Sequence, residues 1–255
     1  MRYKNYVRPA TLEEAWALNQ KRSNRILGGT LWMRMADYSF ATAIDLSDLG
    51  LDKIEINGNE IRIGAMVSLH DIECSELING LCMNAAKDAL VSIVGVQFRN
   101  CATVGGSIFG RFGFSDVLTL FMALDAEVEL YKAGRIPITE FAAKSWGNDI
   151  LTHIIIRNRP VNIKYLSQRN TKTDFPVLTC AVSEIDGILT ASVGARPMRS
   201  VKVQKPCGMS DADFPAYVQE QLIFGSNMRA SAEYRKHIAG VLVRRGLEAI
   251  RRCDA

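Results

Sequence analysis

The chain has 255 residues, of which 48% are hydrophobic and 23% are charged, and its formal net charge is +4. This composition can fill a substantial core, in one large domain or two smaller ones, and it excludes wholesale disorder. The positive charge is weak and spread along the chain, which excludes an extended nucleic-acid interface. The sequence contains neither an apolar run of the ~18 residues that span a bilayer nor the apolar segment of a signal peptide. We therefore expect a cytoplasmic protein without a membrane span.

The six cysteines and three histidines are scattered along the chain. No two cysteines form a Cys-x-x-Cys pair, the close spacing that zinc and iron–sulfur sites usually contain. We expect reduced thiols, several of them in the core, and no metal site in this chain.

The first third of the chain predicts two short strands and two helical segments. Thr11 and Glu14 form a capping box at the start of a helix. Residues 24–27 are expected to form a buried strand, 31–36 a helical turn, and 42–46 a second strand. This order resembles a nucleotide-binding βα unit, but the sequence lacks G-x-G-x-x-G, which disfavours a nicotinamide-binding Rossmann domain.

The middle of the chain predicts a hairpin followed by helices. Isoleucines alternate with polar residues over 54–63, around an Asn-Gly turn. Ser68 is expected to cap a short helix, and a longer helix is expected to open at Ser75 and reach Leu90. Asp116 occupies the position of an N-cap before another helix, which a strand over 127–131 follows.

From about residue 150 the pattern changes to strands followed by helices, the order typical of an α+β domain. Asp186-Gly187 is expected to form the hairpin turn between the last two strands. The expected strands are 154–157, 163–169, 177–184 and 189–194, and the expected helices are 214–224 and 228–252. We place a domain boundary near residues 158–160.

Two glycine-rich turns, about seventy-five residues apart, are the most informative feature of the sequence. The first is Ile26-Leu27-Gly28-Gly29-Thr30, and the second is Ala102-Thr103-Val104-Gly105-Gly106-Ser107. Each follows an apolar or β-branched run and precedes an expected helix. Because glycine has no Cβ, its backbone N–H groups can approach a ligand closely, so two converging turns would form an anion cradle suited to a pyrophosphate. Taken alone, the same residues are equally compatible with two ordinary turns.

The flanking sequence extends the second turn to the motif Gln97-Phe98-Arg99-Asn100-Cys101-Ala102-Thr103-Val104-Gly105-Gly106-Ser107. Three further motifs are Ile61-Arg62-Ile63-Gly64-Ala65, Leu124-Asp125-Ala126-Glu127-Val128 and Arg229-Ala230-Ser231-Ala232-Glu233-Tyr234-Arg235. Over nearly its whole length the chain therefore resembles the FAD-binding subunits of the molybdenum hydroxylases, which include xanthine, carbon monoxide and nicotinate dehydrogenases. Residues 27–30 are similar to the first flavin loop of this family, and residues 102–107 to its second.

The resemblance implies an α+β fold with two domains. Residues 1–158 would form a two-part FAD-binding domain of the PCMH type, with subdomains of about 1–55 and 56–158. Residues 159–255 would form a small α+β domain with an antiparallel sheet and helices. FAD is the implied cofactor of this chain. The molybdenum cofactor and the [2Fe-2S] clusters would belong to partners, a molybdopterin-binding subunit and an iron–sulfur subunit.

The resemblance also implies a set of FAD-binding residues and no catalytic residue in this chain. Asp116 matches an aspartate that contacts the ribityl chain, or it serves only as a helix cap. Lys164 stands near a family lysine that reaches FAD, or it is a solvated strand lysine. Trp32 and Phe109 follow the loops and either flank the flavin or serve in packing. The implied FAD-binding residues are Ile26, Leu27, Gly28, Gly29, Thr30, Leu31, Trp32, Ala102, Thr103, Val104, Gly105, Gly106, Ser107, Phe109, Asp116 and Lys164.

Three departures from the family pattern bear on the function. Leu31 and Ser107 replace polar residues of the two loops, and Arg111–Ser115 stands where many members have a His/Asp-Pro segment. These changes keep the amide donors but remove side-chain hydrogen bonds worth about 0.5–1.5 kcal/mol each. They motivate one alternative, a structural subunit that has lost its flavin.

The resemblance implies an oxidoreductase component that transfers electrons. Electrons would pass from the [2Fe-2S] clusters of a partner to FAD in this chain, and from there to NAD⁺ or another acceptor. A stand-alone FAD-dependent reductase with the same fold is a second alternative. The substrate of the complex is not encoded here, because its pocket would lie in another chain.

Overall fold

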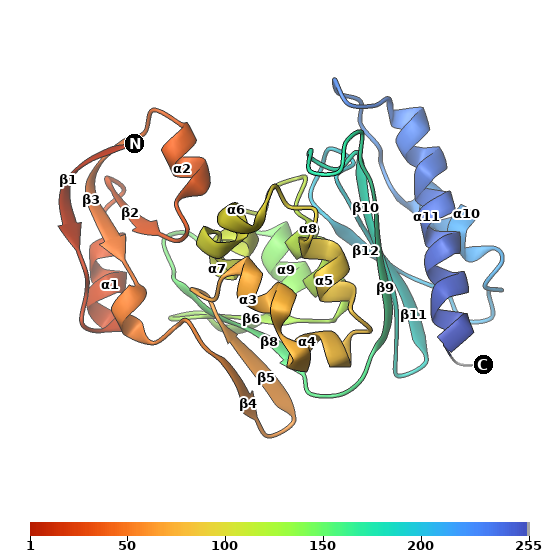
Figure 1. Cartoon of the computed structure of the whole chain (residues 1–255), viewed down its shortest axis with the longest axis horizontal. Coiled ribbons are helices and arrows are strands. Elements are labelled where there is room, and N and C mark those ends of the chain that lie inside the picture. The colour runs from red at the N-terminus through yellow and green to blue at the C-terminus, as the bar shows by residue number, and fades with distance from the viewer. Residues whose placement is uncertain (254–255) are drawn as a thin grey trace. The chain divides into compact units, whose positions relative to one another are not determined.

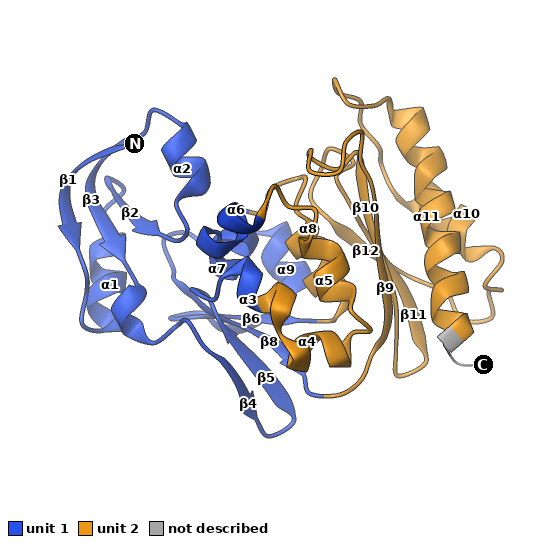
Figure 2. Cartoon of the chain, viewed as in Figure 1, with its two compact units in different colours: residues 1–71, 96–110, 126–158 blue, residues 72–95, 111–125, 159–255 orange. Residues whose placement is uncertain are grey.

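The computed structural model describes residues 1–253 of the chain (Figure 1). The chain forms two compact units, each assembled from segments that are separate in sequence (Figure 2). The first unit comprises residues 1–71, 96–110 and 126–158, and the second comprises 72–95, 111–125 and the chain from 159 onward. The second unit thus includes two segments that the sequence assigns to the FAD-binding domain, and the predicted domain limits stay a prediction.

A three-stranded parallel sheet opens the first unit, in the order β1-β3-β2. Its elements are β1 (Arg2–Val7), α1 (Leu12–Asn19), β2 (Asn24–Leu27), α2 (Leu31–Met35) and β3 (Ser39–Asp45). The Thr11 hydroxyl accepts the Glu14 amide at 3.2 Å, and the Glu14 carboxylate accepts the Ala10 amide at 2.8 Å. The predicted helix start is therefore confirmed. Ala15 of α1 packs against Ile44 of β3 in a small apolar core.

A five-stranded antiparallel sheet completes the first unit, in the order β4-β5-β8-β6-β7. Its strands are β4 (Ile54–Asn57), β5 (Glu60–Gly64), β6 (Glu127–Leu130), β7 (Gly134–Pro137) and β8 (Leu151–Arg157). The predicted hairpin is confirmed, and Ile61 and Ile63 are fully buried on one face of the sheet. The short helices are η1 (Ser47–Leu49), α6 (Val96–Cys101), α7 (Val104–Phe109) and α9 (Ile138–Ala143), and α3 (Leu69–Cys74) begins in this unit.

The second unit is built on a four-stranded antiparallel sheet in the order β12-β11-β10-β9. Its strands are β9 (Asn162–Gln168), β10 (Leu178–Ile185), β11 (Ile188–Gly194) and β12 (Val201–Gln204). Its helices are α4 (Glu76–Leu81), α5 (Ala85–Leu90), α8 (Asp116–Ala123), α10 (Phe214–Gln221) and α11 (Ala232–Cys253). The predicted order of strands followed by helices is confirmed for the C-terminal part of the chain.

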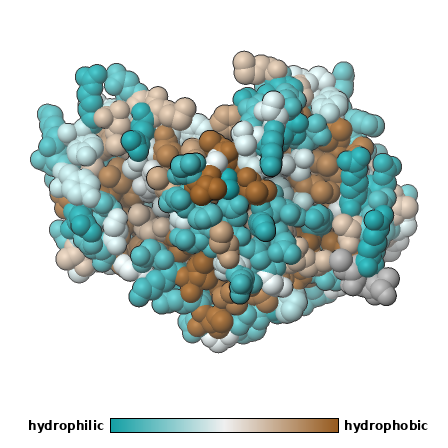
Figure 3. All heavy atoms as spheres, viewed as in Figure 1, coloured by the Kyte–Doolittle hydropathy of each residue, from teal (hydrophilic) through white to brown (hydrophobic). Residues whose placement is uncertain are grey.

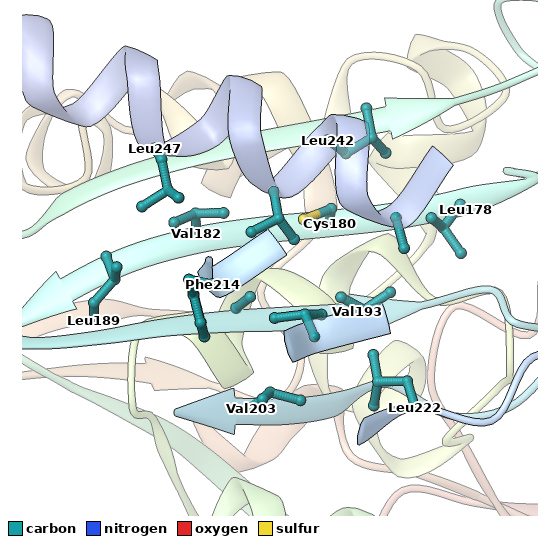
Figure 4. Packing of buried hydrophobic residues seen from close by; sticks show 14 of the residues in the cluster. Leu178, Cys180, Val182, Leu189, Val193, Val203, Phe214, Leu222, Leu242 and Leu247 are labelled. Atoms are coloured by element: carbon teal, nitrogen blue, oxygen red, sulfur yellow. The ribbon is translucent and has the colours of Figure 1, made fainter. Parts of the chain in front are cut away.

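The alternation of residues along β10 gives this sheet two different faces. Cys180 and Val182 belong to the apolar core that the sheet shares with α10 and α11 (Figure 4). Thr179 points to the opposite face, where its hydroxyl lies 2.8 Å from that of Thr119 on α8. The helices α10 and α11 therefore pack on one face of the sheet through apolar side chains, and α8 packs on the other face through hydroxyl groups.

The single helix predicted from Ser75 to Leu90 is wrong. The structure has two helices there, α4 and α5, because Met83 and Asn84 have φ angles of 50° and 62°. This left-handed conformation interrupts a right-handed helix. The Asn79 side chain holds the break, since its Oδ1 accepts the Lys87 amide at 2.9 Å.

On the face shown in Figure 3, hydrophobic residues form small groups among hydrophilic ones. Of the helices within residues 1–253, none is both long and apolar enough to cross a bilayer.

Candidate functional site

The two glycine-rich segments lie against each other in the first unit. A Cβ placed on Gly29 would lie 1.9 Å from the carbonyl oxygen of Cys101, and one on Gly28 would lie 2.8 Å from Thr103 Oγ1. Both distances are far shorter than real Cβ contacts, so only glycine permits this approach. The two segments therefore converge, and the glycines are required by contact between the segments themselves.

The sequence predicted that the second glycine pair forms a turn before a helix, and the structure differs from this prediction. Gly105 and Gly106 lie in the first turn of α7, and Thr103 caps this helix by accepting the Gly106 amide at 3.2 Å. The segment before it is the helix α6. A Cβ on Gly105 would lie 2.6 Å from the Ala65 carbonyl oxygen, so that this glycine lets α7 pack onto the chain after β5.

The amides of the second segment are not free to bind an anion, which corrects the predicted cradle. Four consecutive amides donate within the protein. They are Val104 to the Val67 carbonyl (2.9 Å), Gly105 to the Ala65 carbonyl (2.9 Å), Gly106 to the Thr103 hydroxyl (3.2 Å) and Ser107 to the Thr103 carbonyl (3.0 Å). The Ser107 hydroxyl also donates to the Thr103 carbonyl, at 2.9 Å. The second segment is thus a hydrogen-bonded support for the first.

The first segment carries the available donors. The amides of Gly29, Thr30 and Leu31 have no acceptor among the residues that the structure describes. Thr30 has a φ of 60° and its side chain does not cap α2. A β-branched residue in this left-handed conformation is strained, and such strain is typical of ligand-binding segments. Three successive unengaged amides beside two glycines suit an anionic ligand.

The other predicted residues of the first unit support this loop. Leu27 is buried beside Phe40, and Ile26 is half-buried against the core under α1. Ala102 and Val104 are buried, whereas Trp32 on α2 is 37% exposed. Phe109 closes α7, with its ring centroid 6.0 Å from that of Phe141. Leu27 and Val104 therefore act in packing, and Trp32 is partly exposed.

Asp116 and Lys164 belong to the second unit. Asp116 is not the N-cap of α8, as predicted, because Ser115 takes that position and accepts the Leu118 amide at 3.0 Å. Asp116 is the first residue of the helix and is 5% exposed. The Nζ of Lys164 forms an ion pair with Asp88 Oδ2 at 2.7 Å, so it is a half-buried paired lysine and not a solvated one.

The sequence missed two residues that bind Asp116. Tyr165 and Arg169 both direct their donors to Asp116 Oδ1. Burial raises the pKa of Asp116, and the Arg169 guanidinium and the Tyr165 hydroxyl partly oppose that rise. Both residues lie about fifty positions from Asp116 along the chain, and no local pattern in the sequence marks them.

Comparison with solved structures shows which known chains share this fold. The chain superimposes on a chain of quinoline 2-oxidoreductase from Pseudomonas putida 86 with a TM-score of 0.84, at 18% identity and 98% coverage of both chains. It also superimposes on a chain of carbon monoxide dehydrogenase from Hydrogenophaga pseudoflava with a TM-score of 0.86, at 19% identity, covering 98% of this chain and 97% of the other. The predicted α+β fold class is confirmed.

The family follows from the sequence match. Residues 1–157 match the model of the FAD binding domain in molybdopterin dehydrogenase, and the chain belongs to this family. The family resemblance, FAD as the cofactor and the assignment to an oxidoreductase component are thereby confirmed. The chain is 26% identical to the uncharacterized protein YgfM of Escherichia coli K12, over 93% of both chains. It is 25% identical to the carbon monoxide dehydrogenase medium chain of Afipia carboxidovorans, over 96% of this chain and 95% of the relative.

Proposed function

We propose that this chain is the electron-transferring medium subunit of a molybdenum hydroxylase. Electrons from a molybdopterin-binding subunit would pass through the [2Fe-2S] clusters of an iron–sulfur subunit to FAD in this chain. From FAD they would pass to NAD⁺ or another acceptor. Two curated relatives support this role by their names, the carbon monoxide dehydrogenase medium chain and the glyceraldehyde dehydrogenase medium chain of Sulfolobus acidocaldarius. The latter is 24% identical over 96% of this chain and 98% of its own length.

One observation carries the proposal, the strained first loop with its unengaged amides. The residues fit the diphosphate of FAD: the Gly29, Thr30 and Leu31 amides can donate to its oxygens, and Thr103 and Gly106 support the loop from behind. When bound, FAD supplies the chemistry that links single-electron delivery to a two-electron transfer. The protein's part is to hold the cofactor and to set its surroundings.

Leu31 and Ser107 do not favour the alternative of a subunit without flavin. Leu31 still contributes a backbone donor to the loop, and the Ser107 hydroxyl is engaged with Thr103. FAD contacts by Asp116, Lys164, Trp32 and Phe109 remain predictions from the family resemblance. The cytoplasmic location also remains a prediction.

The purified full chain tests the proposal against the stand-alone reductase. We expect it to bind one FAD, seen as a visible absorption band at about 450 nm, and to oxidise NADPH no faster than free FAD does. Turnover of a substrate with NADPH at ordinary enzymatic rates, about 1–10³ s⁻¹, would establish the reductase instead. A chain that binds no FAD would refute both readings.

A further inference from the structure

The outer strand of the three-stranded sheet is uncovered along its free side. β1 has six residues and pairs with β3, and no strand within residues 1–253 pairs with its other side (Figure 1). Five of its six residues are exposed. The edge strands β2, β4, β7 and β12 have only four residues each, and the longer β9 packs against α5 and α11. Because an open edge offers backbone donors and acceptors to another chain, proteins usually shorten, bend or cover such strands.

The backbone of β1 presents alternate residues to this free side. The Arg2 amide donates to the Tyr38 carbonyl, just before β3, at 2.8 Å. In a parallel pair, the N–H and C=O groups of one residue point to the same side, and those of the next residue point to the opposite side. Every second residue after Arg2 therefore also faces β3. The residues whose backbone groups face the free side are Tyr3, Asn5 and Val7.

Aromatic and basic side chains line this edge. Tyr3 and Tyr6 are 45% and 49% exposed, and their ring centroids lie 6.3 Å apart. Tyrosine is common in protein interfaces because its rigid ring buries a large area at a low cost in entropy. Lys4 is exposed between them, and Arg2 has only an exposed contact of 3.7 Å with Asp37. The edge therefore suits a partner segment with apolar and acidic side chains.

We propose that β1 is the docking edge for an extended acidic segment of the iron–sulfur subunit, which adds a strand beside it. The choice of this subunit rests on the proposed function. A strand paired with β1 would lie three strand spacings, about 14 Å, from β2. The first loop follows β2 directly, and the subunit that delivers electrons to FAD has to approach this loop. The segment on β1 is therefore assigned to that subunit.

A second copy of this chain fits the same edge less well. It would bring its own Arg2 and Lys4 to the edge, and like charges across a strand pair repel each other. A purely protective role is the other alternative for Lys4, since lysine on an edge strand discourages aggregation. These alternatives predict self-association of the parent chain, or aggregation once the lysine is lost. The proposal instead predicts binding of the iron–sulfur subunit through the outward backbone groups.

The first test is the affinity of the full-length chain for the iron–sulfur subunit, measured by isothermal titration calorimetry. Proline is tolerated on an edge strand where its nitrogen faces away from the sheet, so Asn5→Pro should preserve the pairing with β3. We expect it to weaken binding about tenfold, because a donor is removed and its acceptor is left unpaired. Asn5→Ala keeps the amide and should bind within about twofold of the parent. Equal affinities of Asn5→Pro and the parent would overturn the inference.

Lys4→Glu tests the charge of the segment and remains informative if Asn5→Pro fails to fold. Reversal of the charge should weaken binding about tenfold in about 0.1 M salt. The affinity of the parent should fall as the salt rises to about 1 M, because the Debye length shortens from about 10 Å to about 3 Å. Lys53→Glu makes the same change at an exposed lysine of the same unit and should bind like the parent. Affinity that depends neither on salt nor on Lys4 would exclude an acidic segment on this edge.

Hydrogen exchange measures the edge without a variant. The amides of Tyr3, Asn5 and Val7 should exchange rapidly in the chain alone and become protected when the iron–sulfur subunit binds. Unchanged exchange at these amides in the complex would contradict the added strand. Protection by the molybdopterin-binding subunit alone would overturn the assignment to the iron–sulfur subunit.

The remaining outcomes separate this inference from the proposed function. A parent chain that binds no iron–sulfur subunit would refute the proposed function. A parent that binds it, with Asn5→Pro binding equally well, would refute the docking edge alone. Self-association of the parent that Asn5→Pro abolishes would assign the edge to a second copy. Aggregation of Lys4→Glu with parent-like affinity for the subunit would leave Lys4 only a protective role.

Discussion

At the scale of single residues, the glycines of the two loops are required by the protein itself. The position of the Gly29 Cα against the Cys101 carbonyl leaves no room for a methyl group. In contrast, a Cβ added to Gly80 in α4 would have no neighbouring atom within 4 Å, so a methyl group would meet open space there. The same residue type therefore has opposite roles at these two positions.

We expect Gly29→Ala to lower the free energy of unfolding of the FAD-free chain by about 1–3 kcal/mol or more, because two backbone segments would have to separate. Gly80→Ala should raise it by about 0.5–1 kcal/mol, because alanine restricts the unfolded chain and favours a helix. Urea denaturation of both variants measures the difference. Equal stabilities would show that the two segments do not pack as described.

Gly106 offers a test of the anion site at the same scale. Its Cα lies 3.6 Å from a Cβ placed on Gly28, so position 106 lies beside the first loop. We expect Gly106→Asp to weaken FAD binding through repulsion of the diphosphate, at about 1–4 kcal/mol for effective dielectric constants of about 80 to 20.

Gly106→Asn is the matched control, since it has nearly the same size without the charge. It should lose less affinity than Gly106→Asp when FAD is titrated by fluorescence. Equal losses in the two variants would point to steric disturbance and remove the support for an anion site.

At the scale of elements, the C-terminal motif has a structural explanation in the start of α11. The Arg235 side chain is 1% exposed and ties α11 to the preceding segment and to the start of β10. Its bonds go to the Val177 carbonyl (2.9 Å), the Gly225 carbonyl (2.7 Å), the Ala230 carbonyl (2.7 Å) and Asn227 Oδ1 (2.6 Å). Only a guanidinium can supply donors in this many directions.

Arg235→Lys should therefore destabilise the chain by about 3 kcal/mol, the loss of roughly two bonds from a charged donor. Arg244→Lys, on the exposed face of the same helix, should stay within about 0.5 kcal/mol of the parent. Thermal and urea unfolding of the two variants provide the measurement. A similar stability for both would contradict the role assigned to Arg235.

One face of the five-stranded sheet carries a charged cluster from three neighbouring strands, whose side chains are largely buried. Glu129 Oε2 lies 2.5 Å from Arg62 Nη2 and 2.9 Å from His153 Nδ1. Burial, followed by the positive charge of Arg62, lowers the pKa of His153 below its usual 6.5. Although burial acts to raise it, the pKa of Glu129 is held below 4.5 by Arg62 and His153.

Both shifts make the free energy of unfolding fall as the pH falls. A histidine with a lowered pKa binds its proton more weakly in the folded chain, so its contribution is complete above pH 6.5 and is lost as the pH falls through the folded pKa. We expect His153→Gln to flatten the stability profile from about pH 7 to about pH 5, while Glu129 still causes a loss at lower pH. Parallel profiles of parent and variant, measured by urea unfolding, would exclude this role of His153.

At the scale of the whole molecule, the residues proposed for function lie in both compact units. The first contains the strained loop, and the second contains Asp116 with its donors and the apolar core of Figure 4. The proposed function requires partners, because hydroxylation and iron–sulfur chemistry are assigned to other chains.

The assembled complex provides the prediction at this scale. The isolated chain should bind FAD but hydroxylate nothing, and addition of the iron–sulfur and molybdopterin-binding subunits should restore reduction of its flavin by substrate. Anaerobic titration with the substrate of the complex should bleach the band at about 450 nm. The Gly106→Asp variant, in which FAD binding is expected to be weaker, is the control. Unchanged absorbance after addition of both partners and substrate would contradict the proposed electron transfer.

The sequence by itself determined the features that depend on neighbouring residues. The turn at Asp186-Gly187 has φ angles of 54° and 75°, as its residue types predict, and the Thr11 cap and the 54–63 hairpin follow equally local rules. The family and its cofactor were also readable, because the loop motifs are continuous segments of the chain. Local chemistry and contiguous motifs need no knowledge of distant contacts.

The tertiary structure alone decided which of these residues meet and what each one does. It showed that Gly29 packs on Cys101 and that the amides of the second loop donate to acceptors within the protein. It also showed that Asp116 is bound by Tyr165 and Arg169. Gly29 and Cys101 are about 70 residues apart along the chain, and Asp116 is about 50 residues from Tyr165 and Arg169. Periodicity and capping signals extend over a few residues only, so they cannot specify a contact formed when distant elements pack.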